Sequence, residues 1–67
     1  MQLSDAIKVK YKIDTKGKNT VEMANLLRDY GVIGFLLTMN NRTVTMLVPL
    51  EAIKSNRKIM EGVRNED

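Results

Sequence analysis

Residues 7–13 alternate apolar and charged side chains without a break, reading Ile-Lys-Val-Lys-Tyr-Lys-Ile. A period of two is typical of a strand with one buried face, because successive side chains of a strand point to opposite sides. The pattern therefore predicts a strand with an apolar inner side and a basic outer side. Its inward residues are Ile7, Val9, Tyr11 and Ile13, and its outward residues are Lys8, Lys10 and Lys12.

A helix is predicted over residues 20–30. The apolar positions that recur there at helical spacing are Val21, Ala24, Leu27 and Tyr30. Asn19 or Thr20 is suited to cap the first turn, and Glu22 stands three residues after Asn19, as in a capping box. Gly31 follows at the place where a helix favours a left-handed cap.

Two further apolar segments predict a β-hairpin. Residues 32–39 are almost continuously apolar, whereas residues 42–48 alternate and are rich in β-branched side chains. Asn40 and Asn41 between them favour a tight turn, because asparagine tolerates positive φ.

Pro49 ends the second of these strands and suits the first turn of another helix. The apolar stripe of that helix is formed by Leu50, Ile53 and Met60, with Ile59 as a further candidate, and it is interrupted by the polar residues Asn56 and Arg57. Gly62 is the expected stop, which leaves residues 63–67 as a frayed tail and an ordered core of about residues 5–62.

These elements predict an α+β fold in one domain over residues 1–67, a two-layer sandwich of a three-stranded sheet and two helices in the order β-α-β-β-α. Two sheet orders remain open. One places the strand of residues 32–39 in the centre of a mixed sheet, and the other places residues 42–48 in the centre of an all-antiparallel sheet. We prefer the first order because its central strand is the more apolar.

The layout of the last two-thirds of the chain resembles that of a known family. A helix that ends in Tyr30-Gly31-Val32, a hairpin that ends in Thr-Met-Leu-Val-Pro at residues 45–49, and a final helix are similar to the order in HicA-type RNA-interacting toxins. Those enzymes depend on a histidine, which this chain lacks, so the resemblance concerns the fold and implies no activity.

The chain contains neither cysteine nor histidine. Disulfides, histidine-based acid–base catalysis and zinc sites therefore lose their usual residues. The carboxylates are scattered and no phosphate-binding loop motif occurs. We expect no catalytic residue, no metal and no cofactor, and a protein that is not an enzyme.

The location of the protein follows from similar considerations. The longest strongly apolar run covers only residues 32–37, too few to cross a bilayer, and the first twelve residues contain no long apolar core of a signal peptide. Without cysteine, nothing argues for an oxidising compartment. We expect a cytoplasmic protein that makes no membrane contact.

The lysine row formed by Lys8, Lys10 and Lys12 is one candidate binding surface, and Lys16 and Lys18 extend it into the next loop. Its lysines are spaced about two strand rises apart, roughly 7 Å, which approaches the phosphate spacing of a nucleic-acid strand. Lysines also protect edge strands from aggregation, and Tyr11 is expected to point away from the row. The row therefore lacks the aromatic platform of single-strand binders.

The outer face of the predicted hairpin is the other candidate surface. If the odd-numbered residues 33–39 face the helices, the exposed positions include an apolar contact area. The predicted interface consists of Leu36, Thr38, Thr45 and Leu47. Because so short a chain is near the lower limit for folding alone, this surface favours a homodimer.

We therefore expect a small, non-enzymatic regulatory or accessory protein that binds another protein, as a homodimer. The alternative is a nucleic-acid-binding module that uses the lysine row, which the net charge of +3 permits. Nucleic-acid binding weakens steeply with salt, whereas an apolar interface does not, so salt distinguishes the two functions.

Overall fold

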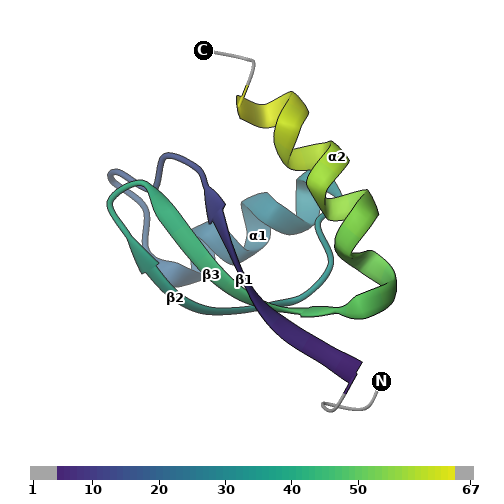
Figure 1. Ribbon diagram of the computed structural model, residues 1–67. Coiled ribbons are helices and arrows are strands. Elements are labelled where there is room, and N and C mark those ends of the chain that lie inside the picture. The colour runs from purple at the N-terminus through teal and green to yellow at the C-terminus, as the bar shows by residue number, and fades with distance from the viewer. Residues whose placement is uncertain (1–4, 65–67) are drawn as a thin grey trace.

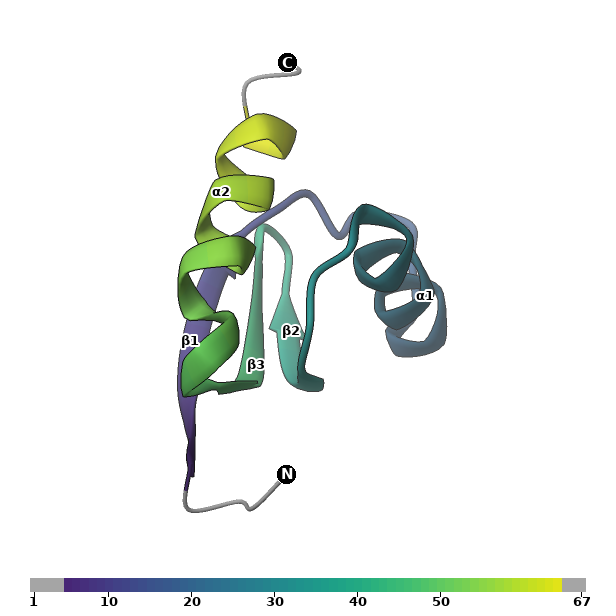
Figure 2. The same ribbon diagram turned by 90° about the vertical axis from the view of Figure 1, so that its right-hand side faces the viewer.

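A computed structural model describes residues 5–64 of the chain, and its elements follow the predicted order β-α-β-β-α (Figure 1). The strands are β1 (Ala6–Lys12), β2 (Phe35–Asn40) and β3 (Thr43–Pro49). The helices are α1 (Thr20–Tyr30) and α2 (Ile53–Arg64), and the 3-10 helix η2 (Leu50–Ala52) precedes α2. Both helices lie on one side of the sheet, which confirms the two-layer α+β fold (Figures 1 and 2).

The order of the strands is β1-β3-β2, and both pairings are antiparallel. The preference for residues 32–39 as the central strand was wrong. The alternating strand β3 is central instead, and its core-facing side chains Val44, Met46 and Val48 are fully or almost fully buried. The apolar strand β2 lies at one edge, where α1 lies beside it (Figure 2).

Helix α1 begins and ends where the sequence predicts. Asn19 Oδ1 accepts a hydrogen bond from the Glu22 backbone at 2.8 Å, and Glu22 Oε1 accepts one from the Asn19 backbone at 3.0 Å, which completes the capping box. Gly31 takes the left-handed cap with a φ of 94°. Leu27 of the predicted stripe is buried, but Val21 is exposed, and Met23 is buried in the core instead.

At its start, before the bulge, β2 has the opposite phase to the predicted one, whereas Thr38 and Met39 point as predicted. Leu36 pairs with the buried Met46, so it points to the core, where it is half-buried. Phe35 points the other way and is 65% exposed. The register shifts by one residue between Leu36 and Thr38, so a bulge at Leu37 returns Met39 to the core side.

The hairpin turn and the second helix also differ in detail from the predictions. Asn41 and Arg42 form the turn, and no described residue other than glycine has positive φ. Helix α2 does not stop at Gly62 but continues to Arg64, because the half-buried Val63 packs against the core. Residues 65–67 of the predicted tail lie outside the described part of the chain.

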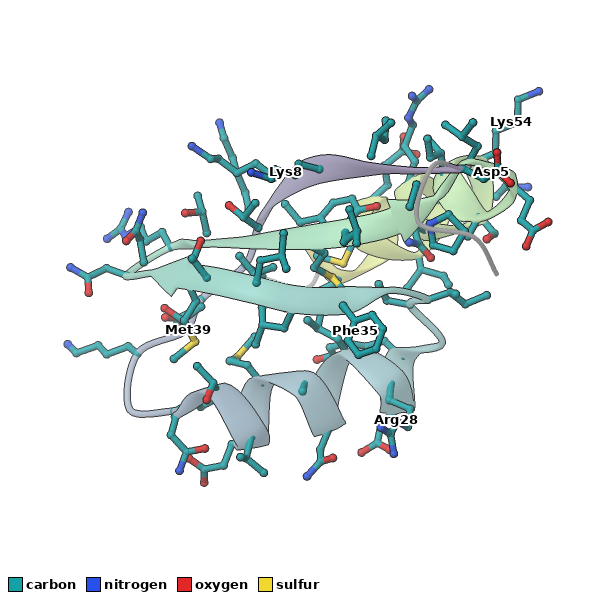
Figure 3. The ribbon with its side chains drawn as sticks, turned by 90° about the horizontal axis from the view of Figure 1, so that it is seen from below. Asp5, Lys8, Arg28, Phe35, Met39 and Lys54 are labelled. Carbon is teal, nitrogen blue, oxygen red and sulfur yellow. The ribbon has the colours of Figure 1, made fainter. Side chains whose placement is uncertain are left out.

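The core lies between the sheet and the two helices, and all elements except β2 contribute buried apolar side chains. Its buried members are Tyr11, Ile13, Met23, Leu27, Val32, Val44, Met46, Val48, Ala52 and Met60. The opposite side of the sheet is not covered by either helix, as the view in Figure 3 shows. This uncovered side carries the candidate site.

Candidate functional site

The open face of the sheet is defined by nine residues in three cross-strand rows. The register places Lys8, Leu47 and Phe35 in one row, Lys10, Thr45 and Thr38 in the next, and Lys12, Thr43 and Asn40 in the last. The lysine row therefore runs along β1 at one edge of this face, and Phe35 lies at the other edge (Figure 3). The three residues of β3 between them are half-buried.

The charge of the open face has one sign only. Its three lysines are exposed, and none of its nine residues is acidic. Neighbouring strands of a sheet lie about 4.8 Å apart, so Phe35 is about 10 Å across the sheet from Lys8. The face thus combines a cationic edge, a centre with threonine hydroxyls and an exposed aromatic ring.

The predicted interface is divided between the two sides of the sheet. Thr38, Thr45 and Leu47 lie on the open face, but Leu36 packs against the core on the opposite side. The expectation that Leu36 is an exposed contact was therefore wrong. The physical reason is the phase of β2, which is set by pairing with β3 and cannot be read from a segment that is apolar at nearly every position.

Phe35 is the site residue that the sequence prediction missed. The alternation within β1 correctly places the lysines on the outer side, but Phe35 was assigned to the core together with its odd-numbered neighbours. The lysine face was therefore expected to lack an aromatic side chain, and the structure contradicts this. No local signal in residues 32–39 distinguishes the two phases.

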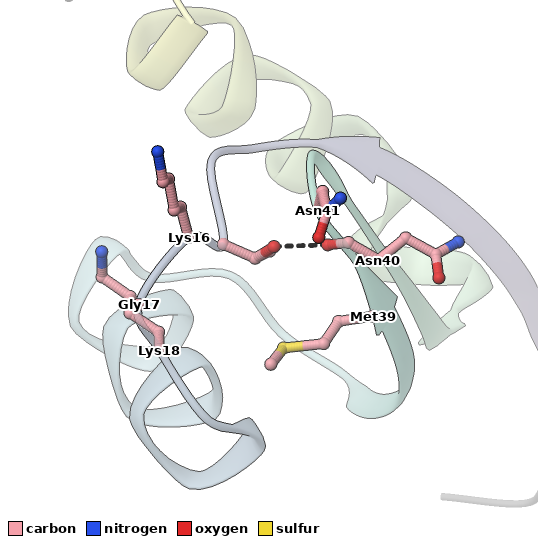
Figure 4. A pocket seen from close by; sticks show the side chains of 7 residues that line it. Lys16, Gly17, Lys18, Met39, Asn40 and Asn41 are labelled. Carbon is pink, nitrogen blue, oxygen red and sulfur yellow. Dashed lines mark hydrogen bonds between the residues drawn. The ribbon is translucent and has the colours of Figure 1, made fainter.

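The loop that follows β1 is held against the end of the hairpin. Ile13 N–H donates to the Arg42 carbonyl at 3.0 Å, and Thr15 N–H donates to the Asn41 carbonyl at 3.3 Å. The Thr15 hydroxyl also donates to the Asn40 carbonyl (Figure 4). A pocket of about 560 Å³ lies between this loop and the hairpin, and it is lined by Thr15, Lys16, Gly17, Lys18, Met39, Asn40 and Asn41.

A second groove, of about 540 Å³, lies between α1 and β2. Val21 and Ala24 of α1 line one wall, and Ile33 and Phe35 line the other. Arg28 is the charged residue of its lining. Three of these apolar side chains, Val21, Ile33 and Phe35, are more than half exposed.

The described residues offer no group of three carboxylates close enough to hold a metal ion. Over the same residues, no helix is long and apolar enough to cross a membrane.

Comparisons with protein-family models, with curated proteins and with solved structures gave no match to this chain.

Proposed function

We propose that the protein binds single-stranded nucleic acid on the open face of its sheet. The observation that carries the proposal is the row of Lys8, Leu47 and Phe35, which puts an exposed aromatic ring on the same face as the lysine row. Lysines spaced about 7 Å apart along β1 suit successive phosphates. An exposed ring suits a base, because every base has a face that stacks on an aromatic side chain.

The charge of the face supports an anionic partner over a second copy of this chain. Two copies that met through their open faces would bring their lysine rows into one interface, and the nine residues supply no carboxylate to pair with them. Like charges that are buried without partners oppose association. A nucleic-acid strand instead supplies one negative charge for each phosphate and gains entropy from the counterions that it releases.

A single strand fits this arrangement better than a duplex. Stacking on Phe35 requires a base that is unpaired and unstacked from its neighbours, and the bases of single strands can adopt this state. The threonine hydroxyls of β3 add donors and acceptors without base specificity. We therefore expect binding to depend weakly on base sequence at this face.

The test measures the fluorescence anisotropy of labelled single-stranded DNA and RNA at low salt, with duplexes of the same sequence as a comparison. Phe35→Leu removes the aromatic face and should weaken binding by about 1–3 kcal/mol, the usual contribution of one stacked base. Lys54→Gln in α2 is the matched control, because Lys54 is exposed but lies outside the open face. Wild-type protein that binds neither DNA nor RNA at low salt would disprove the proposal.

The second candidate function is assembly with a second copy through α1 and β2. It is favoured by the exposed apolar side chains around the groove between these elements, Val21, Ile33 and Phe35. Charges of both signs lie on α1, at Glu22, Arg28 and Asp29, so two copies can meet there without opposing like-charged rows. Burial of the three apolar side chains would supply the stabilisation.

Sedimentation equilibrium tests this second candidate. A dimer would have a mass near twice 7.6 kDa, and Val21→Lys should shift it toward monomer. Leu50→Lys is the control, because Leu50 is also an exposed apolar residue but belongs to η2. A wild-type chain that stays monomeric at the highest concentrations reached would exclude this assembly.

A further inference from the structure

We infer that the pocket between residues 15–18 and the hairpin end holds one nucleotide of the bound strand, an inference that rests on the proposed function. Lys16 and Lys18 would contact its phosphate, and Met39 would contact the face of its base. The amide side chain of Asn41 would bind the edge of the base. This nucleotide site is separate from the stacking position at Phe35.

The loop is already held in the shape that the site requires. Besides its hydrogen bonds to the hairpin, Asp14 Oδ1 accepts from the Lys16 backbone at 3.0 Å, and Lys18 N–H donates to the Thr15 carbonyl at 3.1 Å. Gly17 has a φ of 78°, which permits the tight turn between the two lysines. A binding loop that is ordered beforehand loses less entropy when its ligand arrives.

The lining of the pocket matches the parts of a nucleotide. It contains two cationic side chains and two amides but no carboxylate, since Asp14 does not line it. Met39 is half-buried and supplies an apolar surface, and its side chain extends toward the space between β2 and the loop (Figure 4). Asparagine amides both donate and accept, so they are able to read the edge of a base.

The pocket borders the open face at Asn40. Asn40 lines the pocket and is also the last member of the row of Lys12 and Thr43. Phe35 and Asn40 lie about 13 Å apart along the sheet, because their partners Leu47 and Thr43 are four strand rises of about 3.3 Å apart on β3. An extended strand of about four nucleotides is long enough to reach from one position to the other.

This distance predicts that the pocket contributes to the affinity of longer ligands only. A dinucleotide stacked on Phe35 would be too short to enter the pocket, whereas a hexanucleotide would occupy both positions. We therefore expect the double substitution Lys16→Gln and Lys18→Gln to weaken hexanucleotide binding about tenfold and to leave dinucleotide binding within about twofold. Phe35→Leu should weaken both ligands.

Base preference gives a second measurement on the same site. Hexanucleotides that each contain one type of base should differ in affinity, and Asn41→Ala should reduce this difference. Lysine contacts to phosphate carry no sequence information, so the preference would come from the amide. Circular dichroism should report an unchanged fold for each variant, since the substituted lysines and Asn41 are exposed.

The outcomes separate the two proposals. Equal losses for dinucleotide and hexanucleotide in the Lys16 and Lys18 variant, or a base preference that survives Asn41→Ala, would overturn the nucleotide pocket and leave the open face as the binding site. Wild-type protein that binds neither length would overturn the proposed function itself. A loss confined to the hexanucleotide, with a reduced base preference, would support the pocket.

Discussion

Asn56 of α2 holds both backbone polar groups of Ile33. Its Oδ1 accepts a hydrogen bond from the Ile33 N–H at 2.9 Å, and its Nδ2 donates to the Ile33 carbonyl at 2.8 Å. The Asn56 side chain is 0% exposed, so neither bond competes with water. This pairing joins the second helix to the segment just before β2, and it fixes where the edge strand that carries Phe35 begins.

Replacement of this asparagine is expected to be costly. Asn56→Leu removes both hydrogen bonds and leaves the polar groups of Ile33 facing an apolar side chain, so the free energy of unfolding should fall by about 2–4 kcal/mol. Urea denaturation followed by circular dichroism measures this change. Asn25→Leu serves as the control, because Asn25 is exposed on α1, and it should change stability by about 0.5 kcal/mol or less.

Two glycines should respond in opposite directions to alanine. Gly34 has a φ of 145°, and a Cβ there would lie 2.7 Å from the Leu47 carbonyl oxygen. Gly34→Ala should therefore destabilise the protein by about 2–3 kcal/mol. Gly62 lies within α2 in open space, so Gly62→Ala should stabilise by up to about 1 kcal/mol. Thermal unfolding of both variants gives the comparison, and equal effects would contradict the structure.

The hydroxyl of Tyr11 is buried and has no hydrogen-bond partner among the described residues. The side chain as a whole is 8% exposed and belongs to the core. Since an unpaired buried polar group lowers stability, Tyr11→Phe should raise the free energy of unfolding by about 1 kcal/mol. Tyr30→Phe, at an exposed position, should have no effect. A clear loss of stability in Tyr11→Phe would mean that the hydroxyl has a partner.

The lysine row should determine how nucleic-acid binding responds to salt. Replacement of Lys8, Lys10 and Lys12 by Gln retains much of the side-chain length and removes three charges. The slope of log affinity against log salt should shrink by about 0.7 for each phosphate of a single strand that a lysine no longer neutralises. The decrease in affinity should be similar for all base sequences. An unchanged slope in the triple variant would mean that other cationic side chains bind the phosphates.

Much of the fold can be predicted because its signals are local. The alternation of β1 and the caps of α1 at Asn19 and Gly31 each involve a few neighbouring residues, and the structure confirms them. The strand order could not be predicted in this way. An apolar strand need not be central, because a helix that lies beside an edge strand can cover its apolar side chains.

Only the part of the candidate site that depends on local signals could be predicted. The lysines of β1 follow from alternation alone, whereas the exposure of Phe35 depends on pairing with Leu47 from another strand. Asn56 appeared only as a polar interruption of an apolar stripe, although it is buried and doubly bonded. Its partner is the backbone of Ile33. Because every residue other than proline has the same backbone groups, the type of residue 33 does not indicate that Asn56 bonds there.

The bulge at Leu37 gives β2 one residue more than its pairing with β3 requires. Without that residue the strand would read Phe-Leu-Thr-Met-Asn, a regular alternation with the same side chains on each face as now. It would also present a straighter row of backbone groups, of the kind that recruits strands from other molecules. The extra leucine thus disfavours β2 as a template for aggregation in concentrated solution, and its deletion should lower solubility while preserving the fold.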